Sequence, residues 1–513
     1  MSDERRQPSP PHLELERLAT GIPGLDTVLR GGLLKGGLYI VQGVPGAGKT
    51  IFANEVCYSH VSRGGKALYV TLLAENHARM LQHLSSLRFF DPAHAEDAVT
   101  YVNGFSVLRT DGLRGLLALV RHELEARAAT LLVLDGFVAA QHQAPSETDF
   151  KTFVHELQVL MTLTDCTGLL LSTGSVGQMV APEHTMVDGL IDLDNGQFGF
   201  RTERGLTVRK LRGSGFLQGR HPYEITEDGI IVHPRIEALY GRPTRPDEAK
   251  RAKLPTGVEE LDAMLGGGVV EASMTALVGP SGSCKTSLGL QFLGRSSAAE
   301  PGLLFGFFET PVRLYAKAES MGIDLEGLVK RGHVEILWQA PTEQIMDALA
   351  HKLLEAVARR SVKRLFVDGL GGFIEAAIDP GRISRFFAAV AYELRACGVT
   401  TMYTMEVQQI IAPAVQMPIS GISSMVENLL VTRHVELGRR LHRLLSIVKM
   451  RDSDYDPMFR EITFTKDGLT LADSFAGSEG LLGGFTHRLE RNGGDDETDP
   501  PAPIRPRSPR RRK

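Results

Sequence analysis

Short apolar runs alternate with segments of helical periodicity along the first half of the chain. Between Leu113 and Leu124, apolar residues recur at i, i+3, i+4, i+7 and i+11, which predicts a helix with one buried stripe. The run Leu131–Leu134 has no polar interruption, as in a strand that is covered on both faces. Further strands are predicted at Leu38–Gln42, Leu68–Leu72 and Gly168–Ser172, and a helix is predicted to begin at Lys49.

The second half repeats this order of elements. Strands are predicted at Thr275–Val278, Leu303–Phe307 and Leu365–Val367, with a helix at Ile345–Val357. Alternation of strands and helices favours a mainly parallel sheet with helices on both faces. The sequence therefore predicts an α/β protein with two tandem domains.

A repeated glycine-rich segment indicates that the two domains are homologous. Gly43–Thr50 has an imperfect copy, Gly279–Thr286, which lies 236 residues later. The same offset holds without a gap for the whole stretch Thr20–Thr50, with 11 identities in 31 positions. The first copy is intact, whereas the second has Cys284 at the position of Gly48.

Composition divides the chain into four parts. Of its 513 residues, 42% are hydrophobic, which is enough for two sizeable cores. We expect a flexible polar leader at 1–12, a first domain at 13–247, a second domain at 248–485, and a disordered tail rich in proline and arginine at 486–513.

Charge and cysteine content narrow the functional classes. The net charge of -4 gives no overall basic field, so nucleic acid is not an expected partner, and the basic end Arg510–Lys513 is expected to be solvated. The four cysteines are scattered and fit a reducing compartment. No run of about 18 apolar residues occurs, so no membrane span is expected. We expect a cytoplasmic protein.

The intact glycine-rich segment has the residues of a phosphate-binding loop. Glycines at Gly43, Gly46 and Gly48 let backbone N–H groups approach phosphate oxygens closely. Lys49 is expected to neutralise the β- and γ-phosphates of ATP, and the Thr50 hydroxyl is expected to hold Mg²⁺. The alternative, a chance glycine-rich turn, does not account for the preceding strand, the following helix and the second copy.

Two acidic residues complete the candidate site in the first domain. Asp135 follows the apolar run Leu131–Leu134, which places a carboxylate at the carboxyl end of a strand, and we assign it to Mg²⁺. Glu75 follows the second predicted strand and could deprotonate the attacking water. The alternatives are an Asp that caps a turn and a solvated Glu at a helix start.

Three further motifs resemble the KaiC-like and RadA-like ATPases of the RecA superfamily. Thr20–Asp26, followed by Gly31–Leu33, resembles their opening signature. Lys210–Arg212 and Lys449–Arg451 look like the Lys-x-Arg elements of the KaiC family, which favours KaiC over RadA. The resemblance covers about residues 13–475 and implies two RecA-like P-loop NTPase domains in each chain.

The resemblance also implies a quaternary structure. Members of the KaiC family form rings, usually hexamers, with ATP at the subunit interfaces. Lys210 and Arg212, and by the repeat Lys449 and Arg451, would then reach the γ-phosphate bound by the neighbouring subunit. Without the resemblance, a solvated basic strand edge would be the better interpretation.

The second domain departs from the family pattern. The loop residues expected to bind ATP are Gly279, Gly282, Lys285 and Thr286. Thr286 and Asp368 are expected to hold Mg²⁺, and Glu309 remains as a catalytic base. Family members carry adjacent glutamates after the second strand, and each domain here keeps one of the pair: Ala74 precedes Glu75 in the first, and Phe308 occupies the place of the first acid before Glu309 in the second. Cys284 should weaken nucleotide binding and slow turnover, because a side chain crowds the loop. A redox-sensitive thiol with a lowered pKa is the alternative for Cys284.

The family protein autophosphorylates a Ser-Thr pair in its second domain, and the matching stretch here is Pro418–Ser423. Ser420 falls on the serine position, but Gly421 replaces the threonine. The resemblance therefore makes Ser420 the candidate site for serine/threonine autokinase activity, with an ordinary loop serine as the alternative.

The leading hypothesis is an Mg-dependent ATPase that forms a homohexameric ring and acts as a conformational signalling switch for an unidentified protein partner. One alternative is a DNA-dependent recombination ATPase of RadA or RecA type, which the acidic chain and the absence of a zinc-type cysteine cluster disfavour. The other alternative is a nucleotide sensor without catalytic activity.

Overall fold

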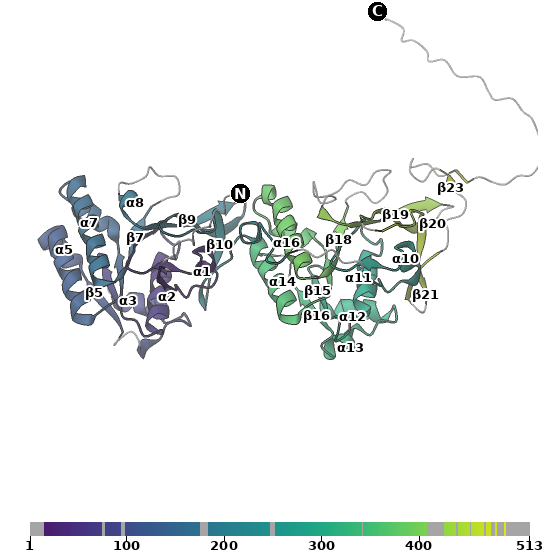
Figure 1. Ribbon diagram of the computed structural model, residues 1–513, viewed down its shortest axis with the longest axis horizontal. Coiled ribbons are helices and arrows are strands. Elements are labelled where there is room, and N and C mark those ends of the chain that lie inside the picture. Colours follow the sequence, from purple (N-terminus) through teal and green to yellow (C-terminus); the bar gives the residue numbers. More distant parts are fainter. Residues whose placement is uncertain are drawn as a thin grey trace, which may run out of the picture.

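Two α/β domains lie side by side in the computed structural model (Figure 1), the first in purple and blue and the second in teal, green and yellow. The predicted leader lies outside the described residues, as does the predicted tail apart from β24 (His487–Arg488), which pairs with β23 (Ser478–Glu479). The structure describes residues 15–73, 77–93, 98–174, 183–246, 252–340, 342–407, 425–437, 440–451, 453–465, 468–472, 478–479 and 487–488.

A nine-stranded sheet forms the centre of the first domain, in the order β11-β10-β9-β8-β3-β7-β6-β4-β5. Its parallel strands are β3 (Leu38–Gly43), β4 (Ala67–Thr71), β5 (Val99–Asn103), β6 (Leu131–Asp135), β7 (Thr167–Thr173) and β8 (Gly189–Phe198). The antiparallel strands β9 (Arg201–Leu211), β10 (Arg220–Thr226) and β11 (Gly229–Val232) extend one edge. The mainly parallel α/β fold predicted from the sequence is confirmed, although the sequence pattern had not indicated these three strands.

Helices cover both faces of this sheet, which explains the uninterrupted apolar runs. In β6, Leu131 and Val133 pack into one core cluster, whereas Leu132 and Leu134 pack into the other. The helices are α1 (Leu25–Val28), α2 (Lys49–Val61), α3 (His77–Leu84), α5 (Phe105–Arg127), α6 (Phe137–Gln143), α7 (Glu147–Thr164), α8 (Glu183–Met186) and α9 (Ile236–Leu239), and a small hairpin joins β1 (Arg17–Leu18) to β2 (Leu33–Leu34).

The second domain repeats the sheet, in the order β16-β15-β17-β18-β14-β19-β20-β21-β22. Its strands are β14 (Met274–Gly279), β15 (Gly302–Gly306), β16 (Val334–Trp338), β17 (Arg364–Asp368), β18 (Thr400–Glu406), β19 (Asn428–Leu437), β20 (Arg440–Lys449), β21 (Arg460–Thr465) and β22 (Gly468–Leu471), with a small pair of β12 (Lys253–Leu254) and β13 (Val269–Val270). Its helices are α10 (Glu259–Met264), α11 (Lys285–Gly294), α12 (Pro311–Glu319), α13 (Leu325–Lys330), α14 (Met346–Arg360), α15 (Gly371–Ala376) and α16 (Ile383–Ala396), with the 3-10 turn η1 (Pro380–Arg382) before α16.

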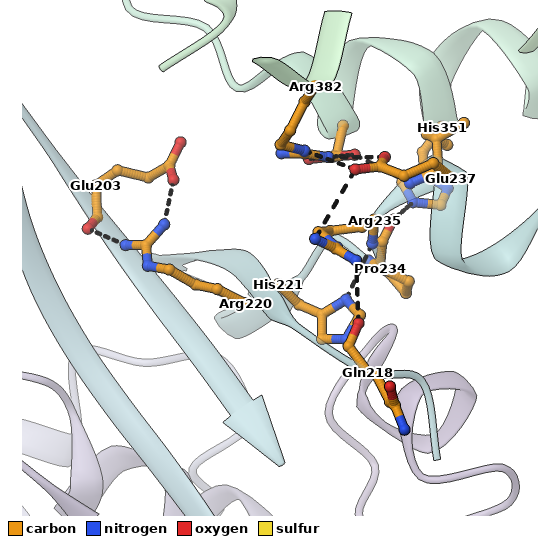
Figure 2. A network of polar contacts seen from close by, with 11 residues as sticks. Glu203, Gln218, Arg220, His221, Pro234, Arg235, Glu237, His351 and Arg382 are labelled. Atoms are coloured by element: carbon orange, nitrogen blue, oxygen red, sulfur yellow. Dashed lines mark hydrogen bonds and ion pairs between the residues drawn. The ribbon is translucent and has the colours of Figure 1, made fainter. Parts of the chain in front are cut away.

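A polar network joins the end of the first domain to the second (Figure 2). Arg382 donates to Glu237 at 2.7 Å and to Asp347 at 2.9 Å. Asp347 is 1% exposed and also accepts the backbone N–H of Ile236 at 3.0 Å. The side chain of Ile236, which is fully buried, belongs to a core cluster of the second domain. The junction therefore combines a desolvated ion network with apolar packing.

We predict that Arg382→Met lowers the free energy of unfolding by about 3 kcal/mol, because Asp347 and Glu237 would lose the cation that compensates their burial. The measurement is urea unfolding at neutral pH. Lys151→Ala, which removes a more exposed i,i+4 partner of Glu147, is the matched control and should leave the unfolding midpoint nearly unchanged. Equal midpoints for the two variants would show that the junction contributes little.

Candidate active site

The intact glycine-rich segment joins β3 to α2 as a phosphate-binding loop. Gly46 and Gly48 have φ of 82° and 90°, and Gly48 is the residue before the first turn of α2. The Lys49 ammonium donates to the carbonyl oxygens of Gly43 at 2.8 Å and Val44 at 3.1 Å. Burial lowers the pKa of Lys49, against the opposing effect of Asp135. The lysine is therefore held inside the loop, beside the amino-terminal end of α2, where anions bind favourably.

Asp135 and Thr50 contribute a carboxylate and a hydroxyl group to this site. Asp135 ends β6, and the Thr50 hydroxyl lies close enough to its carboxylate to lower the pKa of that group. Tyr69 also donates to Asp135, at 2.7 Å. Burial raises the pKa of Asp135, while the hydrogen bond from Tyr69 and the charge of Lys49 lower it. A buried carboxylate of this kind is stabilised in its charged form by a nearby cation.

Magnesium fits these residues. A hydroxyl and a carboxylate in contact are hard oxygen donors of the kind that Mg²⁺ prefers, and it is usually held by few protein groups together with phosphate oxygens and water. Within the described part of the chain, no group of three or more His, Cys, Asp or Glu side chains is placed to hold a metal ion. The hydroxyl and carboxylate pairs that would hold the ion are Thr50 with Asp135 and Thr286 with Asp368.

The second loop has the same arrangement around a cavity of about 780 Å³. Gly282 has φ of 73°, and Lys285 at the start of α11 donates to the carbonyl of Pro280 at 2.6 Å. Asp368 accepts hydrogen bonds from Thr286 at 3.2 Å and from Thr404 at 2.9 Å. Burial raises the pKa of Asp368, and the two hydroxyls oppose this shift.

Cys284 adopts the backbone conformation that its glycine counterpart has. Its φ and ψ are 71° and 17°, against 90° and 17° for Gly48. A residue with a Cβ is strained in this left-handed region by roughly 1–2 kcal/mol. The thiol is partly buried, and burial raises its pKa despite the nearby Arg443, Lys285 and Lys317. The lowered pKa expected for a redox-sensitive thiol is therefore contradicted, because desolvation outweighs the cations.

The acid predicted to act in the second domain is held by a lysine. Glu309 lies just before α12, and its carboxylate is 2.5 Å from the ammonium of Lys317 on that helix. Glu406, which the sequence pattern did not single out, ends β18 directly beside Gly279 and lines the same cavity. Glu75 and Ser420 lie outside the described residues.

The Lys-x-Arg residues lie away from the loops of their own domains. Lys210 is paired with Leu190 near the start of β8. Leu190 is level with Ile40, so the lysine lies toward the amino-terminal ends of the parallel strands, whereas the phosphate loop follows the carboxyl end of β3. Lys210 donates to the carbonyls of His184 and Thr185, and Arg212 also donates to Thr185.

The second Lys-x-Arg element occupies the same edge of its own sheet. Lys449 is paired with Leu429 near the start of β19, and its ammonium donates to the carbonyl of Val426 at 2.8 Å. Arg451 follows two residues later, just beyond the end of β20. Neither element is brought together with the phosphate loop of its own domain.

Two arginines that sequence reasoning missed lie over the loops instead. Arg204 on β9 lines the first site together with Lys49 and Thr50, and Arg443 on β20 lines the second. Each stands six residues before the lysine of its Lys-x-Arg element. That shared spacing is the signal that could have identified them.

These two sites and sheets define the chain as a tandem P-loop ATPase. The profile of the family described as "ATPase: KaiC" matches residues 18–237 and again residues 254–474, so the chain belongs to the KaiC ATPase family. The expected fold and family are thereby confirmed, and the match to both repeats supports ATP as the ligand.

Curated relatives extend over nearly the whole chain. The chain is 25% identical to circadian clock oscillator protein KaiC 1 of Synechocystis over 503 residues, which is 95% of each protein. It is 25% identical to KaiC of Parathermosynechococcus lividus, over 92% of this chain and 88% of the relative. It is 24% identical to KaiC of Prochlorococcus marinus, over 95% and 98% respectively. In the described residues, no helix is both long and apolar enough to cross a membrane.

We predict that Gly48→Cys, which gives the first loop the residue of the second, lowers ATP turnover about tenfold. The left-handed conformation would be strained, and a Cβ there would lie 2.7 Å from the Cδ1 of Ile225. Steady-state phosphate release is the measurement. Cys284→Gly is the reciprocal control and should not reduce turnover. If Gly48→Cys hydrolysed ATP at the wild-type rate, a cysteine at this position would not account for the slow turnover expected of the second domain.

Proposed function

We propose that six copies of the chain form a ring in which ATP binds between subunits and the first domain hydrolyses it. The observation that carries this proposal is the position of Lys210 and Arg212. Lys210 is level with Ile40, three residues before the end of β3, and Arg212 lies two positions farther along, which places them roughly 10 Å and 17 Å from the loop along the strand direction. Their side chains bind the carbonyls of His184 and Thr185 there, and so do not serve the loop of their own domain. A ring in which this edge faces the next subunit's loop would complete each site.

The chemistry follows from the residues of the completed site. A water oxygen would bond to the γ-phosphorus as the bond to the β-phosphate oxygen breaks, giving ADP and phosphate, while Glu75 accepts the proton of the water. Lys49 and the neighbour's Lys210 and Arg212 would stabilise the charge on the transferring group. Thr50 and Asp135 would hold magnesium, which would supply further positive charge to the site.

We further propose that turnover serves as a signal. The contacts between the domains would transmit structural change from one repeat to the other, since Arg201 on β9 donates to the carbonyl of Glu375, which lines the second site. A change in the ring would be recognised by a protein partner in the cytoplasm. Nucleic acid and membrane have no part in this proposal.

We predict that Lys49→Ala abolishes most ATP hydrolysis and that Lys285→Ala removes little of it. Lys49 belongs to the intact site, whereas Lys285 belongs to the site with Cys284 and a paired glutamate. The measurement is phosphate release by the full-length chain with Mg-ATP. If neither variant lowers the rate, the protein is a sensor and not an ATPase. Stimulation by single-stranded DNA would instead favour the recombination ATPase.

We propose Ser420 as the residue to test for autokinase activity. Because Gly421 has no hydroxyl, we predict that no doubly phosphorylated pair forms at positions 420 and 421. The measurement is phosphosite mapping by mass spectrometry after incubation with Mg-ATP, with Ser420→Ala as the control. Phosphate on Ser420 would establish a kinase activity, and its absence alongside ATP turnover would leave a pure ATPase.

A further inference from the structure

Lys317 is a cation inside the second site that has no lysine counterpart in the first. It is the seventh residue of α12, eight positions after Glu309. The seventh residue of α3, eight positions after Glu75, is His83, whose side chain is exposed. The two helices begin equally far from their glutamates, so the comparison concerns the same structural position.

The ammonium of Lys317 is directed into the cavity. It lies 2.5 Å from the Glu309 carboxylate, and both side chains are about one-third exposed, at 34% and 30%. Lys317 lines the cavity with Lys285, Thr286 and Asp368, the residues expected to bind the phosphates and magnesium. The lysine therefore lies against Glu309, the one glutamate of the family's pair that the second domain retains after β15.

An adjacent aromatic ring adds to this effect. Phe308 stands where the family carries the first of two acids, and it is 55% exposed in the cavity wall. A Cβ built on Gly369 would lie 2.8 Å from its ring, so the ring lies against the turn that follows Asp368. Phe308 therefore presents an apolar surface at a position where an acidic side chain would bind and orient water.

We propose that Lys317 holds Glu309 in an ion pair and so makes the second domain a site that retains ATP instead of hydrolysing it. The inference rests on the proposed ATPase function and assigns Lys317 a positioning role. Accepting a proton from water would neutralise the Glu309 carboxylate and so weaken its charge-assisted hydrogen bond to Lys317. The ion pair therefore opposes this proton transfer as long as the lysine remains.

The test uses the full-length chain with Lys49→Ala, so that the second site alone turns over. Adding Lys317→Met should raise kcat about tenfold, which is less than the about 10²–10⁴-fold that general base catalysis supplies in full. Affinity for a fluorescent ATP analogue should stay within about threefold, because the lysine acts on the glutamate and not on the phosphates. The ratio of ATP to ADP that remains bound after gel filtration should fall.

Three further variants in the same background make the result specific. Lys317→Arg preserves the ion pair and should stay as slow as the parent. Lys317→Gln repeats the loss of charge with a different side chain and should behave like Lys317→Met. Adding Glu309→Gln to Lys317→Met should cancel the gain, because the released base would be gone.

Several outcomes would overturn the inference while leaving hydrolysis by the first domain intact. An unchanged kcat in both Lys317→Met and Lys317→Gln would show that the pair does not restrain turnover. A loss of ATP affinity of more than tenfold without faster turnover would make Lys317 a phosphate ligand. A gain that survives Glu309→Gln would assign the base to another acid, with Glu406 the nearest candidate. Failure of the proposed function is distinguishable, since wild-type protein would then release no phosphate.

Discussion

The left-handed residue before each loop lysine is the constraint on which the sites depend. At Gly48 and Cys284 the chain turns from a loop into a helix, and the turn directs the helix's first N–H groups and the lysine toward one point. The strand ends then bring Asp135 or Asp368 to the same edge. Glycine meets this requirement without strain, whereas cysteine meets it at a cost that the rest of the second domain must offset.

The two repeats keep the same geometry and differ in a few side chains. The hydroxyl and carboxylate pairs are present in both, as is an arginine over each loop. The second site adds Cys284, Phe308, Lys317 and Glu406 around that shared framework. Selection on such residues can change the rate of a site without changing its fold, because none of them belongs to the strands' buried faces.

Much of the fold could be predicted from the sequence because burial leaves a simple pattern. A strand such as β6, covered on both faces, has to be apolar throughout, and the glycine-rich loops are local motifs. The antiparallel strands β9 to β11 were missed, since a partly exposed sheet edge carries mixed residues. The pairing of Lys317 with Glu309 and the burial of Cys284 depend on tertiary contacts. No local pattern in the sequence reports them.

The junction also has an evolutionary consequence. Ile236 lies in the first repeat by sequence but packs in the core of the second, and Glu237 shares Arg382 with Asp347. After the duplication these positions could no longer drift independently of residues more than a hundred positions away. Recombination that exchanged one repeat between relatives would preserve packing only if residues 234–237 travelled with the second repeat. At the junction, the segment that has to be inherited together therefore does not coincide with the sequence repeat.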